Sequence, residues 1–433
     1  MTTPTRPTSE PAPEPPPGPV SASAASLAAD RQDERLIQRT GIRGAVDGFV
    51  SRVRAGDLGS LPVVIGLLVI WVAFWLLNPN FLSPVNLVNL TLQCAAVGTI
   101  SIGIVLVLLL GEIDLSVGSV SGLSSAVLAV SFVNLGWPLA LSIGSSIVIG
   151  MLIGLLYGFL FTRFGVPSFV ITLAGLLGFL GLQLWVLGRT GSINIPFDSW
   201  IVQFAQQWFL PDWLSYVLVV LTAAAFAGQL LFTASRRSRA DLTAMSVSAI
   251  VVRSVALLAV LLVPTWYLNQ ARGVGLMFLL FLVLVVVMNF FLLRTRWGRA
   301  VYAIGGNVEA ARRAGIRVKA VYLSVFMLCS TFAAVGGILA AGRLAAANQG
   351  SGGGDTNLNA IAAAVIGGAS LFGGRGSAYS ALLGILVIQS ISSGLTLMNL
   401  DSSIRYMITG AVLLLAVIVD SLSRRTRVSH GRA

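Results

Sequence analysis

Charged residues are scarce in this chain of 433 residues, and their scarcity excludes a soluble globular protein. Only 10% of the residues are Asp, Glu, Lys or Arg, whereas 56% are hydrophobic. Seven of the 16 acidic residues lie before residue 58. The rest of the chain therefore has few charges with which to cover a surface in water, where about 25% charged residues are typical. We expect most of the chain to lie within a membrane.

Several classes of catalytic and cofactor site are excluded because their key residues are rare. The chain has one histidine, His430, and two cysteines, Cys94 and Cys329, in separate apolar stretches. Histidine-based triads, zinc sites and disulfide frameworks therefore lack their components. The only lysine, Lys319, does not lie in a GxxxxGK[ST] motif, which excludes a P-loop. We expect no catalytic residue, no metal, no cofactor and no ATPase site in this chain.

Long apolar runs are abundant, and they predict an all-α polytopic membrane protein in a lipid bilayer, with about 12 transmembrane helices (10–12). Each run is close to the ~20 residues that a spanning helix needs. The segment at 357–372 is short and bounded by glycines. The expected spans are 61–77, 88–110, 114–134, 138–161, 168–188, 212–233, 249–269, 274–293, 319–341, 357–372, 376–397 and 404–421.

The basic residues indicate how these spans are oriented. With a cytoplasmic N-terminus and twelve alternating spans, 23 of the 28 Lys and Arg residues fall in cytoplasmic segments. Cytoplasmic loops are enriched in Lys and Arg, so both termini are expected in the cytoplasm. The formal net charge of +12 is divided among short clusters between apolar runs, which indicates membrane orientation and not nucleic-acid binding.

The chain is expected to have three regions. Residues 1–57 form a disordered cytoplasmic N-terminal tail, because eight of the 16 prolines lie in the first 20 positions and no sustained apolar run follows. Residues 58–422 form the transmembrane domain. Residues 423–433 form a short basic cytoplasmic tail.

The segment GEIDLSVGS at 111–119 places two carboxylates, Glu112 and Asp114, between apolar spans. Carboxylates near a membrane interior need a partner, a helix N-terminus or water. Asp114 or Ser116 could cap the following helix by accepting a backbone N–H, and we favour this structural role for Asp114. The alternative is a carboxylate pair that couples transport to protons or ions. Ser119 ends the motif and is a further candidate residue.

A short helix is predicted within the basic loop 294–319. Asn307 is a favourable N-cap, Glu309 lies in the first turn, and Gly315 suits the position after the last turn. Such a helix either lies on anionic lipid or docks into a groove of a cytoplasmic partner. The full segment is Gly305-Gly306-Asn307-Val308-Glu309-Ala310-Ala311-Arg312-Arg313-Ala314-Gly315.

A loop rich in glycine and amides, 348–359, is expected outside the membrane. It includes Asn357 and Asn359 and leads into the short apolar segment. Irregular polar backbone at membrane depth normally lines a cavity or is buried in protein. The loop is therefore either a contact surface for a polar uncharged solute or partner, or a flexible connector beside closely packed helices.

Four ordered motifs give the sequence a resemblance to the permease subunits of ATP-binding-cassette (ABC) monosaccharide importers, the ribose and xylose group. The resemblance covers about residues 61–421, which is nearly all of the transmembrane domain at 58–422. We therefore expect 58–422 to be the permease domain. Within the group the chain most resembles the xylose-type permeases, by Glu112, LGWPL at 135–139 and an inserted pair of spans at about 212–269. The motifs are GEIDLSVGS (111–119), VPSFVITLAGLLGF (166–179), the segment 298–316 that ends in AIGGNVEAARRAGI (303–316), and NAIAAAVIGGASLFGGRGS (359–377).

This resemblance implies a transporter subunit that moves a monosaccharide, expected to be D-xylose, across the cytoplasmic membrane. The helix at 307–315 would be the coupling helix that seats in an ATPase subunit with two nucleotide-binding domains. Two permease copies would form a homodimer, and an extracytoplasmic sugar-binding protein would deliver the sugar. The assembled complex would then be a monosaccharide-transporting ATPase. Asn357-Leu358-Asn359 departs from the Glu-Leu-Asp that is frequent in the family.

Two other functions compete with this one. An ion-coupled secondary sugar carrier would use Glu112 and Asp114 and would need no ATPase partner. A polytopic membrane enzyme would need a catalytic constellation, for which only the same two carboxylates are available. We rank the enzyme last.

Overall fold

The computed structural model describes residues 61–401 except 241 and 243, together with isolated positions between 403 and 418. The predicted tails at 1–57 and 423–433 lie outside the described residues, and the predicted span at 404–421 lies largely outside them. Within the described part, nine helices are long and apolar enough to cross a membrane. They are α3 (Pro84–Leu109), α4 (Val117–Ala129, extended by a π-helical turn to Asn134), α5 (Leu139–Phe164), α6 (Ser168–Leu187), α8 (Asp212–Arg239), α9 (Val247–Leu268), α10 (Leu276–Arg294), α13 (Val318–Leu344) and α15 (Ala378–Leu397).

Shorter elements connect these helices. One of them, α2 (Leu61–Leu77), is apolar throughout, whereas α14 (Gly354–Ile366) has a polar first half and an apolar second half. The others are the 3₁₀ turns η2 (Pro79–Leu82) and η4 (Gly188–Thr190), the helices α7 (Trp200–Gln206), α11 (Arg296–Gly306) and α12 (Val308–Arg313), and the strands β1 (Ser192–Asn194) and β2 (Ala346–Asn348). The strands pair antiparallel, with Ile193 opposite Ala347. The predicted all-α polytopic fold is confirmed, although the count of twelve spans is not.

The chain divides into two compact units. Residues 220–258 carry most of α8 and α9, the pair that the sequence suggested as an insertion. Only 11% of the most apolar window of α8 and 6% of that of α9 is buried within the protein. Apolar helices with so little protein around them are suited to contact lipid.

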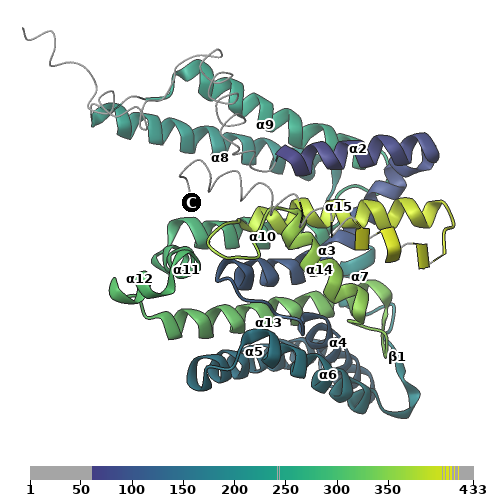
Figure 1. Ribbon diagram of the computed structural model, residues 1–433. Coiled ribbons are helices and arrows are strands. Elements are labelled where there is room, and N and C mark those ends of the chain that lie inside the picture. The colour runs from purple at the N-terminus through teal and green to yellow at the C-terminus, as the bar shows by residue number, and fades with distance from the viewer. Residues whose placement is uncertain are drawn as a thin grey trace, which may run out of the picture. The chain divides into compact units, whose positions relative to one another are not determined.

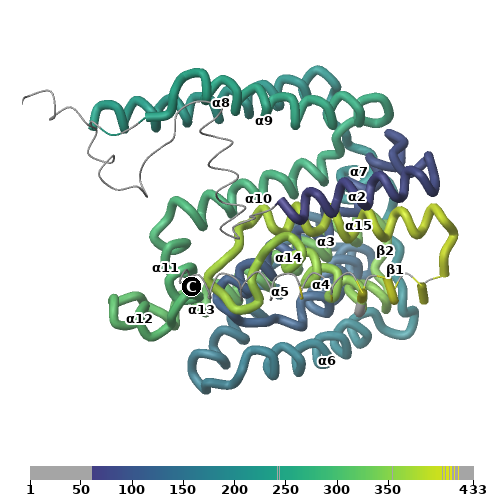
Figure 2. The backbone as a smooth tube through the Cα atoms, turned by 45° about the horizontal axis from the view of Figure 1, so that its top comes forward, coloured from purple at the N-terminus to yellow at the C-terminus, as the bar shows by residue number. Residues whose placement is uncertain are grey.

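The other unit is built around α3 and α13. The most apolar window of α3 is 89% buried and that of α13 is 61% buried. Helix α13 packs against α3, α4 and α5, while α14 and α15 pack against each other and against α3, an arrangement that can be followed in Figure 2. On α5, Gly150, Gly154 and Gly158 face the backbone or small side chains of α13. Small residues at this spacing let two helices approach closely within a membrane.

The described helices of this unit have two ends that are used below. Figure 1 shows α11 and α12 at one end and β1 at the other. We call these the α12 end and the β1–β2 end. The loops 110–116 and 367–377 belong to the α12 end. Gly374 donates its backbone N–H to the carbonyl of Leu109, and Tyr302 of α11 donates its hydroxyl to the carbonyl of Gly376.

The structure corrects the predicted span at 357–372. Helix α14 has 13 residues and ends at Ile366. At about 1.5 Å per residue it reaches about 20 Å, less than the ~30 Å of a hydrocarbon core. The backbone then leaves the helix through Gly368, Gly373, Gly374 and Gly376, all with positive φ angles.

Candidate functional site

Asp114 lies in the loop between α3 and α4 and is 1% exposed. Its Oδ1 accepts hydrogen bonds from the backbone N–H of Ser116 at 2.8 Å and from the Ser116 hydroxyl at 2.7 Å. Ser116 is the N-cap of α4, so Asp114 fixes the turn that starts this helix, and α4 begins at Val117 and not at residue 114. Cys329 of α13 donates its S–H to Oδ2 at 3.6 Å. Ser119 donates its hydroxyl to the carbonyl of Ser116.

Glu112 has different partners. Its Oε2 accepts the hydroxyl of Ser168, the first residue of α6, at 2.6 Å. Thr172, one turn later, donates to the carbonyl of Ile113 at 3.4 Å. The first two sequence motifs therefore meet at the start of α6. Burial raises the pKa of Glu112 and of Asp114, and the serine hydrogen bonds oppose this shift in both. Among the described residues, no ion pair neutralises either carboxylate.

The substitution Asp114→Asn is expected to lower the yield of folded protein more than it lowers transport per folded molecule. The asparagine keeps an acceptor for Ser116 but replaces the second acceptor with a donor, which faces the S–H of Cys329. A buried unsatisfied polar group typically costs about 1–3 kcal/mol. The measurement is the amount of monodisperse protein and the uptake per folded molecule, with Ser119→Ala as the control that removes one local hydrogen bond. A well-folded Asp114→Asn variant without transport would show that the carboxylate itself takes part in coupling.

The predicted short helix is present as α12. The side-chain oxygen of Asn307 accepts the backbone N–H of Ala310 at 2.9 Å, as an N-cap does. Gly315 has a φ of +80°, which explains the glycine after the last turn. Glu309 pairs with Arg312 at 2.5 Å, and both side chains are more than 60% exposed. Ala310 is also exposed. The helix thus presents a compact charged surface that the rest of the described chain does not cover.

A backbone contact joins α11, the helix that directly precedes α12, to the end of α3 and to the loop after α14. Gly305, in the last turn of α11, lies directly against the carbonyl of Leu109 and the backbone nitrogen of Gly374. Gly374 donates its N–H to the Leu109 carbonyl at 2.9 Å. We call Leu109, Gly305 and Gly374 the glycine junction. It brings together residues from two of the four sequence motifs, 298–316 and 359–377, at the C-terminal end of α3.

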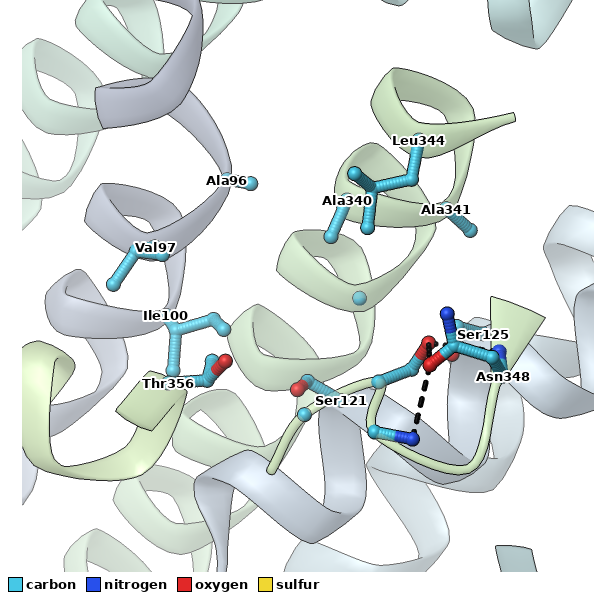
Figure 3. A pocket seen from close by; sticks show the side chains of 14 residues that line it. Ala96, Val97, Ile100, Ser121, Ser125, Ala340, Ala341, Leu344, Asn348 and Thr356 are labelled. Carbon is cyan, nitrogen blue, oxygen red and sulfur yellow. Dashed lines mark hydrogen bonds between the residues drawn. The ribbon is translucent and has the colours of Figure 1, made fainter. Parts of the chain in front are cut away.

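A cavity of about 310 Å³ lies between α3, α4 and α13, and the loop 348–352 closes one side of it. Figure 3 shows Val97 and Ile100 of α3 on one side, and Ala340 and Leu344 of α13 on the other. None of the described side chains that line it is charged. Its polar groups come from the side chains of Ser121, Ser125, Asn348, Ser351 and Thr356 and from the backbone of the loop.

The loop that closes this cavity is held in place by α6. Gln183, which is fully buried, donates from Nε2 to the carbonyls of Asn348 at 3.0 Å and Ser351 at 2.9 Å. Gly352 has a φ of +67° and packs on the carbonyl of Gly118 in α4. The loop is therefore an ordered wall of the cavity and not only a flexible connector.

The structure places the predicted asparagines near this cavity but not in its lining. Asn357 is 6% exposed and packs on Gly118, and its Oδ1 has no hydrogen-bond partner among the described residues. Asn359 is half-buried. The lining serines Ser121 and Ser125 were missed. Their spacing of four residues places both on one face of a helix, which is the signal that could have found them.

Comparisons with known proteins agree with this architecture. Residues 86–417 match the family described as branched-chain amino acid transport system / permease component. The chain is 36% identical to the xylose transport system permease protein of Escherichia coli K12, over 87% of this chain and 95% of that protein. It is 31% identical to the ribose import permease protein of Bacillus subtilis, over 84% and 94%. It is 30% identical to the fructose import permease protein of Rhizobium meliloti, over 85% and 88%.

No solved structure matches the chain significantly. The family match covers most of the described helices, and the relatives are matched over nearly their whole lengths. The chain therefore belongs to this permease family, as a multi-pass sugar permease of the ribose and xylose type from ABC transporters.

Proposed function

We propose that this permease imports a monosaccharide, D-xylose, across the cytoplasmic membrane, driven by ATP hydrolysis in a partner subunit. The observation that carries the substrate is the 36% identity to a xylose permease over 95% of that protein. The relatives named for ribose and fructose also transport monosaccharides. An uncharged cavity with several hydroxyl groups is compatible with a solute of this class.

The α12 end faces the cytoplasm in this proposal, and both chain termini lie on that side. The stretch 294–319, which includes α11 and α12, holds seven Lys and Arg residues, and such clusters favour the cytoplasmic side. Helix α12 is then the coupling helix that seats in an ATPase with two nucleotide-binding domains. An extracytoplasmic sugar-binding protein delivers the sugar at the β1–β2 end, and two permease copies form the assembly.

ATP drives transport in this assembly only if it changes the balance between inward-open and outward-open states. The chain has no P-loop, so the energy enters through a contact with the partner. The glycine junction links α11, which leads into α12, to α3 and to the loop after α14. These helix ends are the first elements that a movement of the coupling helix would displace.

The test is uptake of labelled D-xylose by vesicles that contain the permease with its ATPase and binding protein. We expect accumulation against a gradient that requires ATP and the ATPase subunit. Unlabelled D-ribose and D-fructose added as competitors then rank the sugars. The alternative, an ion-coupled carrier, is favoured by the buried Asp114 and the half-buried Glu112, neither of which has a basic partner in the described residues. Uptake by the permease alone that collapses with a protonophore would support the carrier.

A further inference from the structure

We propose that the cavity between α3, α4 and α13 is a weak binding site for the sugar on its way through the permease. The ligand class is a small, neutral, polyhydroxylated molecule, and Ser121, Ser125 and Thr356 contact it. The proposal rests on the proposed function, which supplies the direction of transport and the substrate, and it adds the place and the residues.

The size of the cavity suits one monosaccharide. Its volume of about 310 Å³ lies at the lower end of the roughly 300–1,000 Å³ found for ligand pockets. It extends from the exposed residues Leu344 and Gly350, at the β1–β2 end, to Ile100, Ser121 and Ser125, each no more than 2% exposed. A solute that arrives at this end would therefore meet the rim first and the serines last.

The lining has the mixed chemistry of a sugar ring. Val97, Ile100 and Leu344 present apolar surface, which suits the C–H faces of a pyranose. The serine and threonine hydroxyls and the backbone groups of loop 348–352 can bond to sugar hydroxyls. A charged solute would find no described side chain of opposite sign in the lining, and burying an unpaired charge is strongly unfavourable. The cavity thus selects against ionic solutes.

The hydrogen bonds within α4 indicate that binding is weak. Ser121 donates its hydroxyl to the carbonyl of Gly118, and Ser125 donates to that of Gly122, both at 2.7 Å. Each serine therefore offers mainly its lone pairs, unless it gives up the bond within the helix. A sugar gains less binding free energy from these hydroxyls than from hydroxyls whose donors are free. We therefore expect it to dissociate readily. Weak binding is required at an intermediate position on a transport path.

The test uses a cysteine at the cavity and one beside it. Ser125 lines the cavity, whereas its neighbour Ser124 is fully buried and does not line it. Ser125→Cys and Ser124→Cys are each made in the complete complex and treated from the binding-protein side with a small, uncharged methanethiosulfonate. The unchanged chain is the blank, because Cys94 and Cys329 are buried and neither of them lines the cavity.

We expect the Ser125→Cys variant to react about tenfold faster or more than the Ser124→Cys variant, because thiol reactivity follows access to the reagent. Saturating D-xylose should slow the reaction at position 125, and the adduct should stop D-xylose uptake by the same variant. Thr356→Cys provides a second cavity position with the same expectation if Ser125→Cys does not fold.

Two failures can be told apart. In the first failure, the unchanged complex imports sugar, but the cysteine variants give a negative result. Either the cysteines at 125 and 356 react no faster than the cysteine at 124, or their adducts leave sugar uptake intact. Either result would show that the cavity is not on the transport path. That result would overturn this inference and leave the proposed function standing. In the second failure, the unchanged complex takes up no sugar although the cysteine at 125 reacts rapidly. The cavity would then be accessible, but the proposed function would be wrong. The identification of its ligand as a sugar would be wrong as well.

Discussion

Complexes that carry Glu309→Lys are expected to lose sugar-stimulated ATP hydrolysis by about tenfold or more, which corresponds to about 1.4 kcal/mol. Glu309 is exposed in the first turn of α12 and pairs with Arg312. A lysine there breaks this pair and puts a third positive charge on a six-residue helix that already contains Arg312 and Arg313. It also places a cation at the positive end of the helix dipole. A partner groove that accepts the present charge pattern would meet like charges instead, which typically costs several kcal/mol.

The controls separate docking from folding. Glu309→Gln removes the negative charge without reversing it, so stimulation should fall much less than in Glu309→Lys. Deletion of 307–315 removes the helix and should abolish stimulation. Membrane insertion should remain intact in all three variants, because α12 is exposed and contributes only Ala311 as a buried residue. Normal stimulated hydrolysis in Glu309→Lys and in the deletion would show that α12 is not the coupling helix.

The sequence predicted this helix almost completely, because its determinants are local. The N-cap Asn307, the acidic first turn and Gly315 lie within nine residues of one another and act through bonds to their own neighbours. Long apolar helices are predictable for a similar reason. The span expected at 61–77 coincides with α2 (Leu61–Leu77), and the one expected at 376–397 begins two residues before α15. Each depends on the composition of one continuous segment.

The cavity and the glycine junction were not predicted, because they depend on contacts between distant segments. Leu109 meets Gly374, and the loop at Asn348 is held by Gln183. Nothing near position 183 in the sequence indicates which loop its amide reaches. The premature end of α14 at Ile366 has a related cause. Gly367 and Gly368 follow the helix, and Gly368 has a φ of +99°, which is a local signal for a helix end. The packing of Gly367 on the backbone of Ser380 is the part that only the structure shows.

The glycine junction allows a direct comparison of two neighbouring positions. A methyl group at Gly305 would overlap the carbonyl oxygen of Leu109 and lie within 2.6 Å of the backbone nitrogen of Gly374, whereas one at Gly306 would meet nothing within 4 Å. Both residues lie in the last turn of α11, so alanine improves the helix propensity of each by a similar amount, up to about 1 kcal/mol. The difference between Gly305→Ala and Gly306→Ala therefore isolates the contact.

Gly305→Ala is expected to lower the free energy of unfolding by about 1–3 kcal/mol relative to Gly306→Ala, the usual range for overpacking. It should also reduce sugar-stimulated ATP hydrolysis per folded complex by about tenfold or more, because α11 must shift away from Leu109 and the hydrogen bond from Gly374 is strained. Thermal unfolding in detergent and ATP hydrolysis by the assembled complex measure the two effects separately. Equal stimulation in both variants would mean that movement of α12 reaches α3 by another route. Gly305→Ala could also lose stimulation while its unfolding midpoint stays unchanged. The contact between Gly305 and Leu109 would then contribute to coupling and not to stability, because it would matter only while α11 and α12 move.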